Sequence, residues 1–196
     1  MKRKRPRGEE TTTRLLDAAL ALYAEAPVGF TVHAVVARSG VSLGSLYHHF
    51  GSFDGLAASL YAESMAALLD ALLASLEGVT AARAGIVALV KAYLAFTKRH
   101  RARASFIHAS SYAAFVPAHA ATIEAARAPR IERLLAWLHP HVRAGRVVEL
   151  PVPLVEMLVI GPVAEVARRW LAGAPGVDLD DAARRLPERI WRSVAR

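Results

Sequence analysis

The chain contains no cysteine among its 196 residues, which excludes a disulfide scaffold and a cysteine-ligated zinc site. Charged residues make up only 21% of the chain and hydrophobic residues 54%, a balance too apolar for a disordered protein. The longest stretch without formal charge, residues 104–123, contains serines, histidines and a proline, so we predict no membrane span there. The basic N-terminus lacks the apolar segment of a secretory signal. We therefore expect a cytoplasmic protein without a membrane partner.

Two sequence motifs that carry catalysis are also absent. The chain has no Gly-Lys-Ser phosphate loop and no His-Glu-x-x-His pair. None of its glutamates is followed three residues later by a histidine, which excludes the paired ligands of a helical di-iron site. The two histidines of the pair His48 and His49 do not lie on the same helix face, and neither do His139 and His141. We expect no enzyme activity, no catalytic residues, no metal site and no cofactor.

The sequence does contain positive charge and helix-forming residues. Lys and Arg total 25 against 17 Asp and Glu, a net charge of +8 that is compatible with a polyanionic partner. Abundant Ala and Leu, and apolar residues at helical spacing, predict an all-α fold. We predict about nine helices, at residues 11–26, 32–39, 42–50, 53–76, 80–100, 104–114, 118–144, 153–172 and 178–195. Breaks could interrupt the helix at Pro129 and Pro140, and kinks or restarts are expected at Gly161-Pro162 and Pro187.

Residues 31–50, Thr-Val-His-Ala-Val-Val-Ala-Arg-Ser-Gly-Val-Ser-Leu-Gly-Ser-Leu-Tyr-His-His-Phe, have the layout of a helix-turn-helix. Gly40 can adopt the positive φ that lets two short helices cross steeply. The outward side chains of the second helix are short or polar, which suits a major groove about 12 Å wide. The small apolar core is expected from Val35, Val36, Val41, Leu46 and Phe50. We therefore predict that the second helix reads DNA.

With its flanking segments, this motif resembles the N-terminal domain of TetR-family bacterial transcriptional regulators. The resemblance covers about residues 12–60 and rests on Leu-Leu-Asp-Ala-Ala at 15–19, Gly-Phe-Thr-Val at 29–32 and Ala-Arg-Ser-Gly-Val-Ser-Leu-Gly-Ser-Leu-Tyr-His-His-Phe-Gly-Ser at 37–52. Residues 161–171 are similar to the family's penultimate, dimer-forming helix. The resemblance implies an N-terminal arm and three-helix DNA-binding domain at 1–51. It also implies a larger helical ligand-binding and dimerisation domain at 52–196.

The same resemblance implies DNA contacts residue by residue. Thr31 would cap the second helix and touch a phosphate, and the other expected DNA-binding residues are Ser42, Leu43, Gly44, Ser45, Tyr47, His48 and His49. Phe53 departs from the family, which usually has a DNA-contacting lysine there. The basic residues Lys2, Arg3, Lys4, Arg5 and Arg7 could replace that contact, as other N-terminal arms do, or could form a solvated terminus.

The resemblance further implies a pocket for a small apolar or amphipathic effector. Its candidate residues are Tyr61, Met65, Tyr93, Phe96, Phe106, His108, Tyr112 and Trp137, although the same composition describes an ordinary core. A homodimer is expected because two recognition helices about 34–36 Å apart can enter successive major grooves of a palindrome. The candidate interface residues are Val155, Leu158, Val159, Val163, Val166, Trp170, Leu186 and Ile190. The apolar helix faces that these residues form could instead pack within the core of a single chain.

Two functions are therefore compatible with the sequence. The first is a sequence-specific DNA-binding transcriptional regulator, a repressor released from a palindromic operator by a small-molecule effector. The second is a helical interaction or ligand-carrier protein without specific DNA readout. The operator, the effector and the regulated genes do not follow from the residues.

Overall fold

The computed structural model describes residues 7–111 and 113–196. Within these residues the chain forms eleven α-helices and a 3-10 turn, with no β-strand, which confirms the predicted all-α fold. The helices are α1 (Arg7–Glu25), α2 (Val32–Ser39), α3 (Leu43–Phe50), α4 (Phe53–Ser75), α5 (Ala82–Arg99), α6 (Arg101–Ser110), α7 (Phe115–Ala118), α8 (Ala120–Arg143), α9 (Val152–Val159), α10 (Gly161–Leu171) and α11 (Leu179–Val194).

The predicted number of nine helices was too low for two reasons. The restart expected at Gly161-Pro162 is real, because α9 ends at Val159 and α10 begins at Gly161 with Pro162 in its first turn. The short helix α7 was not predicted. The breaks expected at Pro129 and Pro140 were wrong, because α8 continues through both prolines. Helix α11 likewise continues through Pro187 without a restart. Packing of these long helices outweighs the local cost of proline.

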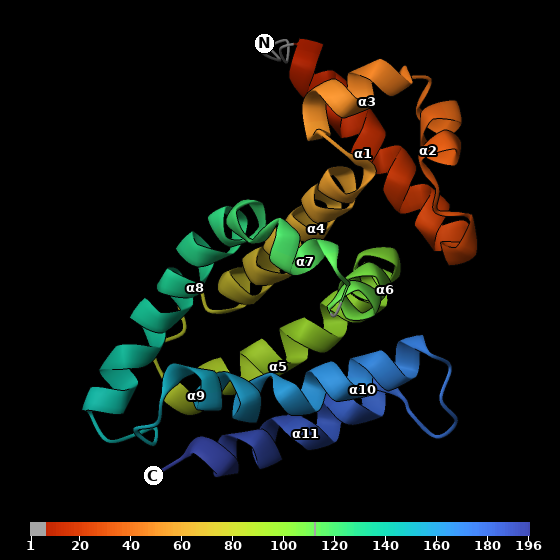
Figure 1. Ribbon diagram of the computed structural model, residues 1–196. Coiled ribbons are helices and arrows are strands. Elements are labelled where there is room, and N and C mark those ends of the chain that lie inside the picture. The colour runs from red at the N-terminus through yellow and green to blue at the C-terminus, as the bar shows by residue number, and fades with distance from the viewer. Residues whose placement is uncertain (1–6, 112) are drawn as a thin grey trace, which may run out of the picture.

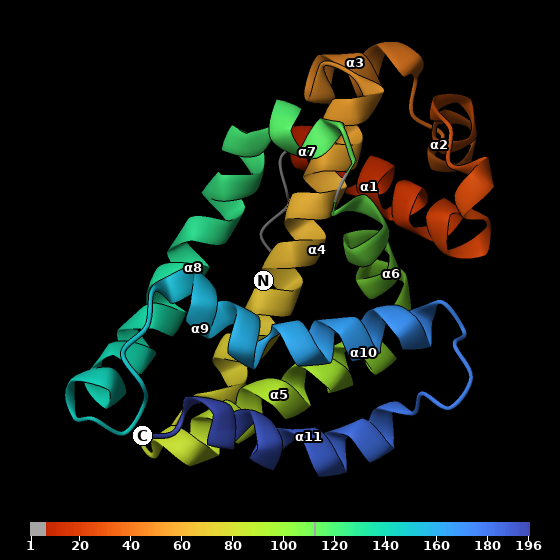
Figure 2. The same cartoon turned by 60° about the horizontal axis from the view of Figure 1, so that its bottom comes forward.

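The helices form a small N-terminal unit and a larger body. Helices α1, α2 and α3 pack together at one end, and α4 runs from them into the body (Figure 1). In the body, α4 lies beside α8, and α5 lies beside α11. Helices α9 and α10 follow one another along the outside of α5 and α11 (Figure 2). Helix α4 is therefore the covalent and structural link between the two parts.

Helix α4 is the central core helix. By length and composition it could cross a membrane, with 23 residues and a mean hydropathy of 1.4 in its most apolar window, but 61% of that window is buried. Leu56, Leu60 and Leu72 are each 3% exposed or less. Its apolar residues are thus covered by the surrounding helices, mainly α5 and α8.

Aromatic rings join the N-terminal unit to the body. Phe106 of α6 is 2% exposed, and its ring centre lies 4.9 Å from that of Tyr23 and 5.8 Å from that of Phe30. Phe53, the first residue of α4, stacks on Phe30 at 5.0 Å. Such contacts contribute about 0.5–1.5 kcal/mol each beyond area burial. The orientation of the N-terminal unit is therefore set by α4 and α6 together.

Candidate functional site

The helix-turn-helix is built by local capping signals. Thr31 caps α2, since its Oγ1 accepts a hydrogen bond of 3.3 Å from the backbone N–H of Ala34. Ser42 caps α3 in the same way, because its Oγ accepts a hydrogen bond of 3.2 Å from the backbone N–H of Ser45. Gly40 lies between them with φ +62°, the left-handed conformation that the sequence predicted. These three residues fix where each helix begins and where the chain turns.

The core beneath α3 holds it against the rest of the unit. Val35 and Leu46 are fully buried, and Val41 is 7% exposed, as predicted. The predicted Val36 and Phe50 are only partly buried.

Helix α1 is tied to the end of α2 by a hydrogen bond of 2.7 Å, in which Arg14 Nη2 donates to the carbonyl oxygen of Ser39. This bond joins α1 to the end of α2, just before the turn that leads into α3.

The outer face of α3 is polar and open. Tyr47 is 44% exposed, and Ser42, Gly44, His48 and His49 are also exposed. Leu43 and Ser45 are partly buried on the same helix, and Thr31 is exposed at the start of α2. The structure thus brings together on α3 and its cap seven of the eight residues predicted to contact DNA. Hydroxyl groups and imidazoles at these positions can reach phosphates and base edges.

Phe53 has a structural role that explains the departure from the expected lysine. It is partly buried in the core and stacks on Phe30, so its side chain faces the inside of the molecule. Of the predicted basic arm, Lys2, Arg3, Lys4 and Arg5 lie outside the described residues, and Arg7 begins α1. Whether the arm contacts DNA stays a prediction.

A cavity of about 210 Å³ lies in the body between α4, α5, α8 and α9. Its wall is almost entirely apolar. The lining residues are Met65, Leu68, Leu69, Leu72, Ile86, Leu89, Tyr93, Ile107, Arg127, Ile131, Leu134, Leu135, Trp137, Leu138, Val152, Val155, Glu156, Val159 and Ile160. Arg127 and Glu156 are the charged residues of this described wall.

Three predicted pocket residues, Met65, Tyr93 and Trp137, line this cavity. The prediction is corrected for four others, Tyr61, Phe96, Phe106 and His108, which lie outside the wall. On α4 the cavity begins at Met65, beyond Tyr61, and on α5 it ends at Tyr93, before Phe96. Phe106 packs on the N-terminal unit instead. Tyr112 lies outside the described residues.

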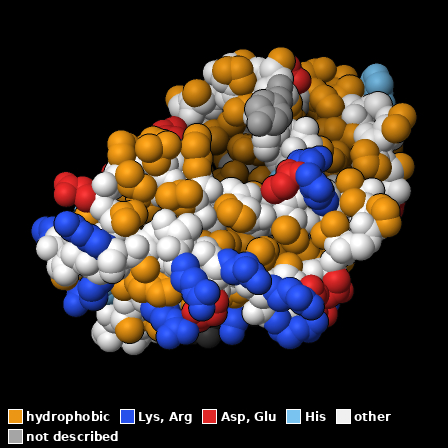
Figure 3. All heavy atoms as spheres, turned by 90° about the horizontal axis from the view of Figure 1, so that it is seen from below, with side chains coloured by type: hydrophobic (Ala, Val, Ile, Leu, Met, Phe, Trp, Pro, Cys, Tyr) orange, Lys and Arg blue, Asp and Glu red, His pale blue; other side chains and the backbone are white. Residues whose placement is uncertain are grey.

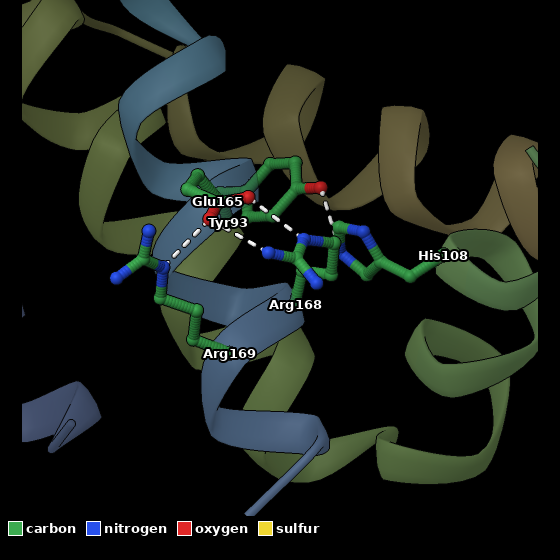
Figure 4. Close-up of polar contacts among 5 residues, drawn as sticks. All are labelled: Tyr93, His108, Glu165, Arg168 and Arg169. Atoms are coloured by element: carbon green, nitrogen blue, oxygen red, sulfur yellow. Dashed lines mark hydrogen bonds and ion pairs between the residues drawn. The ribbon is translucent and has the colours of Figure 1, made fainter. Parts of the chain in front are cut away.

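His108 adjoins the cavity through Tyr93. The Tyr93 hydroxyl and His108 Nε2 are 3.3 Å apart, and Glu165, Arg168 and Arg169 of α10 lie next to this pair (Figure 4). Burial, reinforced by Arg168, lowers the pKa of His108, and burial raises the pKa of Tyr93. The pair is therefore a neutral hydrogen-bonded group between the cavity and α10.

The predicted dimer residues divide into buried and partly exposed ones. Val155, Val159, Val163 and Ile190 are each 6% exposed or less in the single chain, and Val155 and Val159 line the cavity. This placement corrects the prediction, because these four belong to the chain's own core. The residues that keep exposed surface are Leu158, Val166, Trp170 and Leu186. Figure 3 shows the underside of the molecule, where apolar side chains are mixed with charged ones.

Sequence reasoning missed the charged pair of the cavity, Arg127 and Glu156. An arginine on a helix is usually a solvated surface residue, so neither residue stood out. The spacing of Arg127, Ile131, Leu134 and Leu138 along α8 marks a single helix face, which is the signal that could have been used. Within residues 7–111 and 113–196, the His, Asp and Glu side chains form no group of three or more that could hold a metal ion.

Sequence comparison supports the N-terminal resemblance. Residues 15–60 match the family model described as bacterial regulatory proteins, tetR family. This segment contains the second half of α1, all of α2 and α3, and the start of α4. No curated protein matches the chain by sequence.

Solved structures share the fold over nearly the whole chain. A TetR family transcription regulator from Marinobacter aquaeolei VT8 is 19% identical, with a TM-score of 0.76, covering 96% of this chain and 97% of that one. A TetR-like transcriptional regulator from Rhodococcus sp. RHA1 is 21% identical, with a TM-score of 0.67 and coverage of 97% and 98%. The transcriptional regulator FadR from Bacillus subtilis, solved in complex with stearoyl-CoA, is 17% identical, with a TM-score of 0.74 and coverage of 91% and 96%.

Proposed function

We propose that this chain, which is TetR-like in its N-terminal sequence and in its fold, is a sequence-specific transcriptional regulator that binds a palindromic operator as a homodimer in the cytoplasm. The observation that carries the proposal is the polar, exposed face of α3, held outward by the buried Leu46. The DNA-binding unit would be residues 1–51, and residues 52–196 would bind the effector and the partner copy.

The composition of α3 favours base readout over simple charge attraction. The helix contains no lysine or arginine, so its own contribution to affinity comes from hydrogen bonds and shape. Such contacts to base edges distinguish sequences, whereas phosphate contacts mainly position a protein. Tyr47 is suited to a phosphate contact, and Ser45 and His48 to base edges.

Dimer formation is proposed through α10 and α11. A two-fold arrangement of these helices would form a four-helix bundle and place two copies of α3 on one side. Leu158, Val166, Trp170 and Leu186 retain surface for such a contact.

A small molecule in the cavity would act as the effector, and its binding would release a repressor from the operator. The stearoyl-CoA complex of FadR supports an amphipathic ligand in a protein of this fold. Helix α4 lines the cavity at one end and begins beside α3 at the other, so a change in the cavity can reorient the DNA-binding unit. A coupling of about 1–3 kcal/mol would change operator affinity about 5- to 150-fold.

Alanine variants on α3 test the proposal on DNA fragments that the protein retains from bacterial genomic DNA. Tyr47→Ala should weaken binding to all fragments alike, and His48→Ala should change which fragments are preferred. His139→Ala, which removes an exposed imidazole from α8, is the matched control and should change neither property. Uniform weakening by both α3 variants would remove base readout from this helix.

Salt dependence separates the regulator from an interaction or ligand-carrier protein. Binding to any DNA weakens as salt rises, with a slope of about −0.9 per neutralised phosphate. A regulator should keep its preference for the retained sequence over random DNA as salt rises. A merely basic protein should lose its binding to the retained sequence and to random DNA together. Loss of preference at moderate salt would favour the second function.

A further inference from the structure

The cavity has one polar end. Arg127 of α8 and Glu156 of α9 stand in its wall with 3.5 Å between Nη2 and Oε2. The other polar side-chain groups of the wall are the Tyr93 hydroxyl, which already contacts His108, and the Trp137 indole N–H, which already donates to the carbonyl oxygen of Val79. A ligand that fills this space therefore meets charge at one end only.

Arg127 is held loosely by its carboxylate partners. Its second partner, Glu124, lies 3.6 Å away. Both distances exceed the 2.7–2.9 Å typical of a charge-assisted hydrogen bond. By contrast, Arg130, one turn further along α8, meets both oxygens of Asp70 at 2.8 and 2.9 Å. The guanidinium of Arg127 thus keeps N–H groups that a better-placed oxyanion can accept from.

The Arg127 side chain, 34% exposed, is less accessible than that of Glu156, at 51%. Glu156 can therefore turn into solvent more easily, while Arg127 stays in the cavity wall. The charge of Arg127 also reaches the interior, since it partly opposes the rise in the pKa of Tyr61 that burial causes. These differences favour an anionic ligand group over a cationic one.

The shape of the cavity limits the rest of the ligand. The α8 face from Arg127 to Leu138 spans eleven residues and therefore about 16 Å. A volume of about 210 Å³ is below the roughly 300–1,000 Å³ of pockets for drug-sized molecules. A volume of this size lined along about 16 Å of α8 suits an unbranched chain better than fused rings.

We propose that the cavity binds a single-chain amphiphile with a carboxylate head, which pairs with Arg127 in place of Glu156 while its tail lies along the apolar face of α8. This assignment rests on the proposed function and names the chemical class of its effector. Displacement of Glu156 removes an ion pair between α8 and α9. Because α9 packs on α10 and α11, the ligand also acts on the helices proposed to bind the partner copy.

The test compares three probes with the same tail: decanoate, 1-decanol and decyltrimethylammonium. Binding is measured without DNA, by isothermal titration calorimetry and by the fluorescence of Trp137, which lines the cavity, after Trp170→Phe and Trp191→Phe substitution. Decanoate should bind about tenfold or more tightly than decanol, as expected for a hydrogen-bonded ion pair. No binding of decanoate, or equal binding of all three probes, would overturn the proposal.

Variants then locate the head group. Arg127→Gln should remove the preference for decanoate and leave decanol affinity unchanged, whereas Glu156→Gln should strengthen decanoate binding. The matched control is Arg133→Gln, which changes an exposed arginine on the same helix. Tightest binding of decyltrimethylammonium, abolished by Glu156→Gln, would assign a cationic ligand instead. Failure of these ligand tests with specific DNA binding intact rejects the ligand class alone, and loss of DNA specificity with ligand binding intact rejects the proposed function.

Discussion

Trp137 packs so closely against α5 that glycine is required at position 85. A Cβ atom added to Gly85 would lie 2.0 Å from Trp137 Cζ2 and 2.2 Å from its Cη2. The ring is also fixed by its Nε1, which donates a hydrogen bond of 2.9 Å to the carbonyl oxygen of Val79. Gly85→Ala must therefore displace the indole that forms part of the cavity wall.

The expected change in the free energy of unfolding is the sum of three contributions, of which the third opposes the first two. Overpacking costs about 1–3 kcal/mol, and loss of the indole hydrogen bond about 1 kcal/mol. Alanine in place of glycine inside a helix returns about 1 kcal/mol. We therefore expect Gly85→Ala to lower the free energy of unfolding by about 1–3 kcal/mol.

The sign should reverse when the indole is absent. In a Trp137→Ala background the added methyl group no longer meets the ring, so Gly85→Ala should raise the free energy of unfolding by up to about 1 kcal/mol. The wild type, the two single variants and the double variant form a double-mutant cycle. The free energy of unfolding of each is measured by urea unfolding followed by far-ultraviolet circular dichroism. Gly161→Ala, where an added Cβ meets nothing within 4 Å, is the control and should not destabilise. Equal effects of Gly85→Ala in both backgrounds would refute the packing of Trp137 on α5.

Three further outcomes are expected. Leu46→Ala should lower the free energy of unfolding by about 2–5 kcal/mol in urea titrations, because the side chain is fully buried; a loss below 1 kcal/mol would contradict its role under α3. Ser52→Ala removes the hydrogen bond of 2.9 Å that caps α4 and should cost about 1 kcal/mol, whereas an unchanged midpoint would show that the cap contributes nothing. Because burial lowers the pKa of His108 in the folded state, stability should be full above the unfolded pKa of about 6.5 and should fall as the pH drops through and below it. His108→Gln should reduce that pH dependence of the melting temperature and His139→Gln should not; identical slopes for wild type and His108→Gln would contradict the cause assigned.

The DNA-binding unit was predictable because its signals are local. Thr31, Gly40 and Ser42 each act on residues within four positions along the chain, and each does what its residue type predicts. The restart at Gly161-Pro162 was predictable for the same reason. Local signals of this kind are readable without knowledge of the tertiary structure.

The arrangement of the body was harder to predict, because the sequence of one helix does not show which other helices pack against it. Val155 and Val159 lie on an apolar stripe, but only the tertiary structure reveals that the stripe faces the cavity and not a partner copy. Arg127 and Glu156 are separated by 29 positions, and their meeting depends on how α8 and α9 lie. The role of Phe53 likewise depends on its contact with Phe30, which lies on the other side of the helix-turn-helix in the sequence.

Specific DNA binding by a dimer is tested most directly by selecting fragments of bacterial genomic DNA with the purified full-length protein at moderate salt and sequencing what is retained. We expect one short palindrome, with half-sites about 34–36 Å apart, and a changed enriched sequence for His48→Ala. Retention of fragments without a common sequence, in the same proportions for wild type and His48→Ala, would contradict sequence recognition by α3.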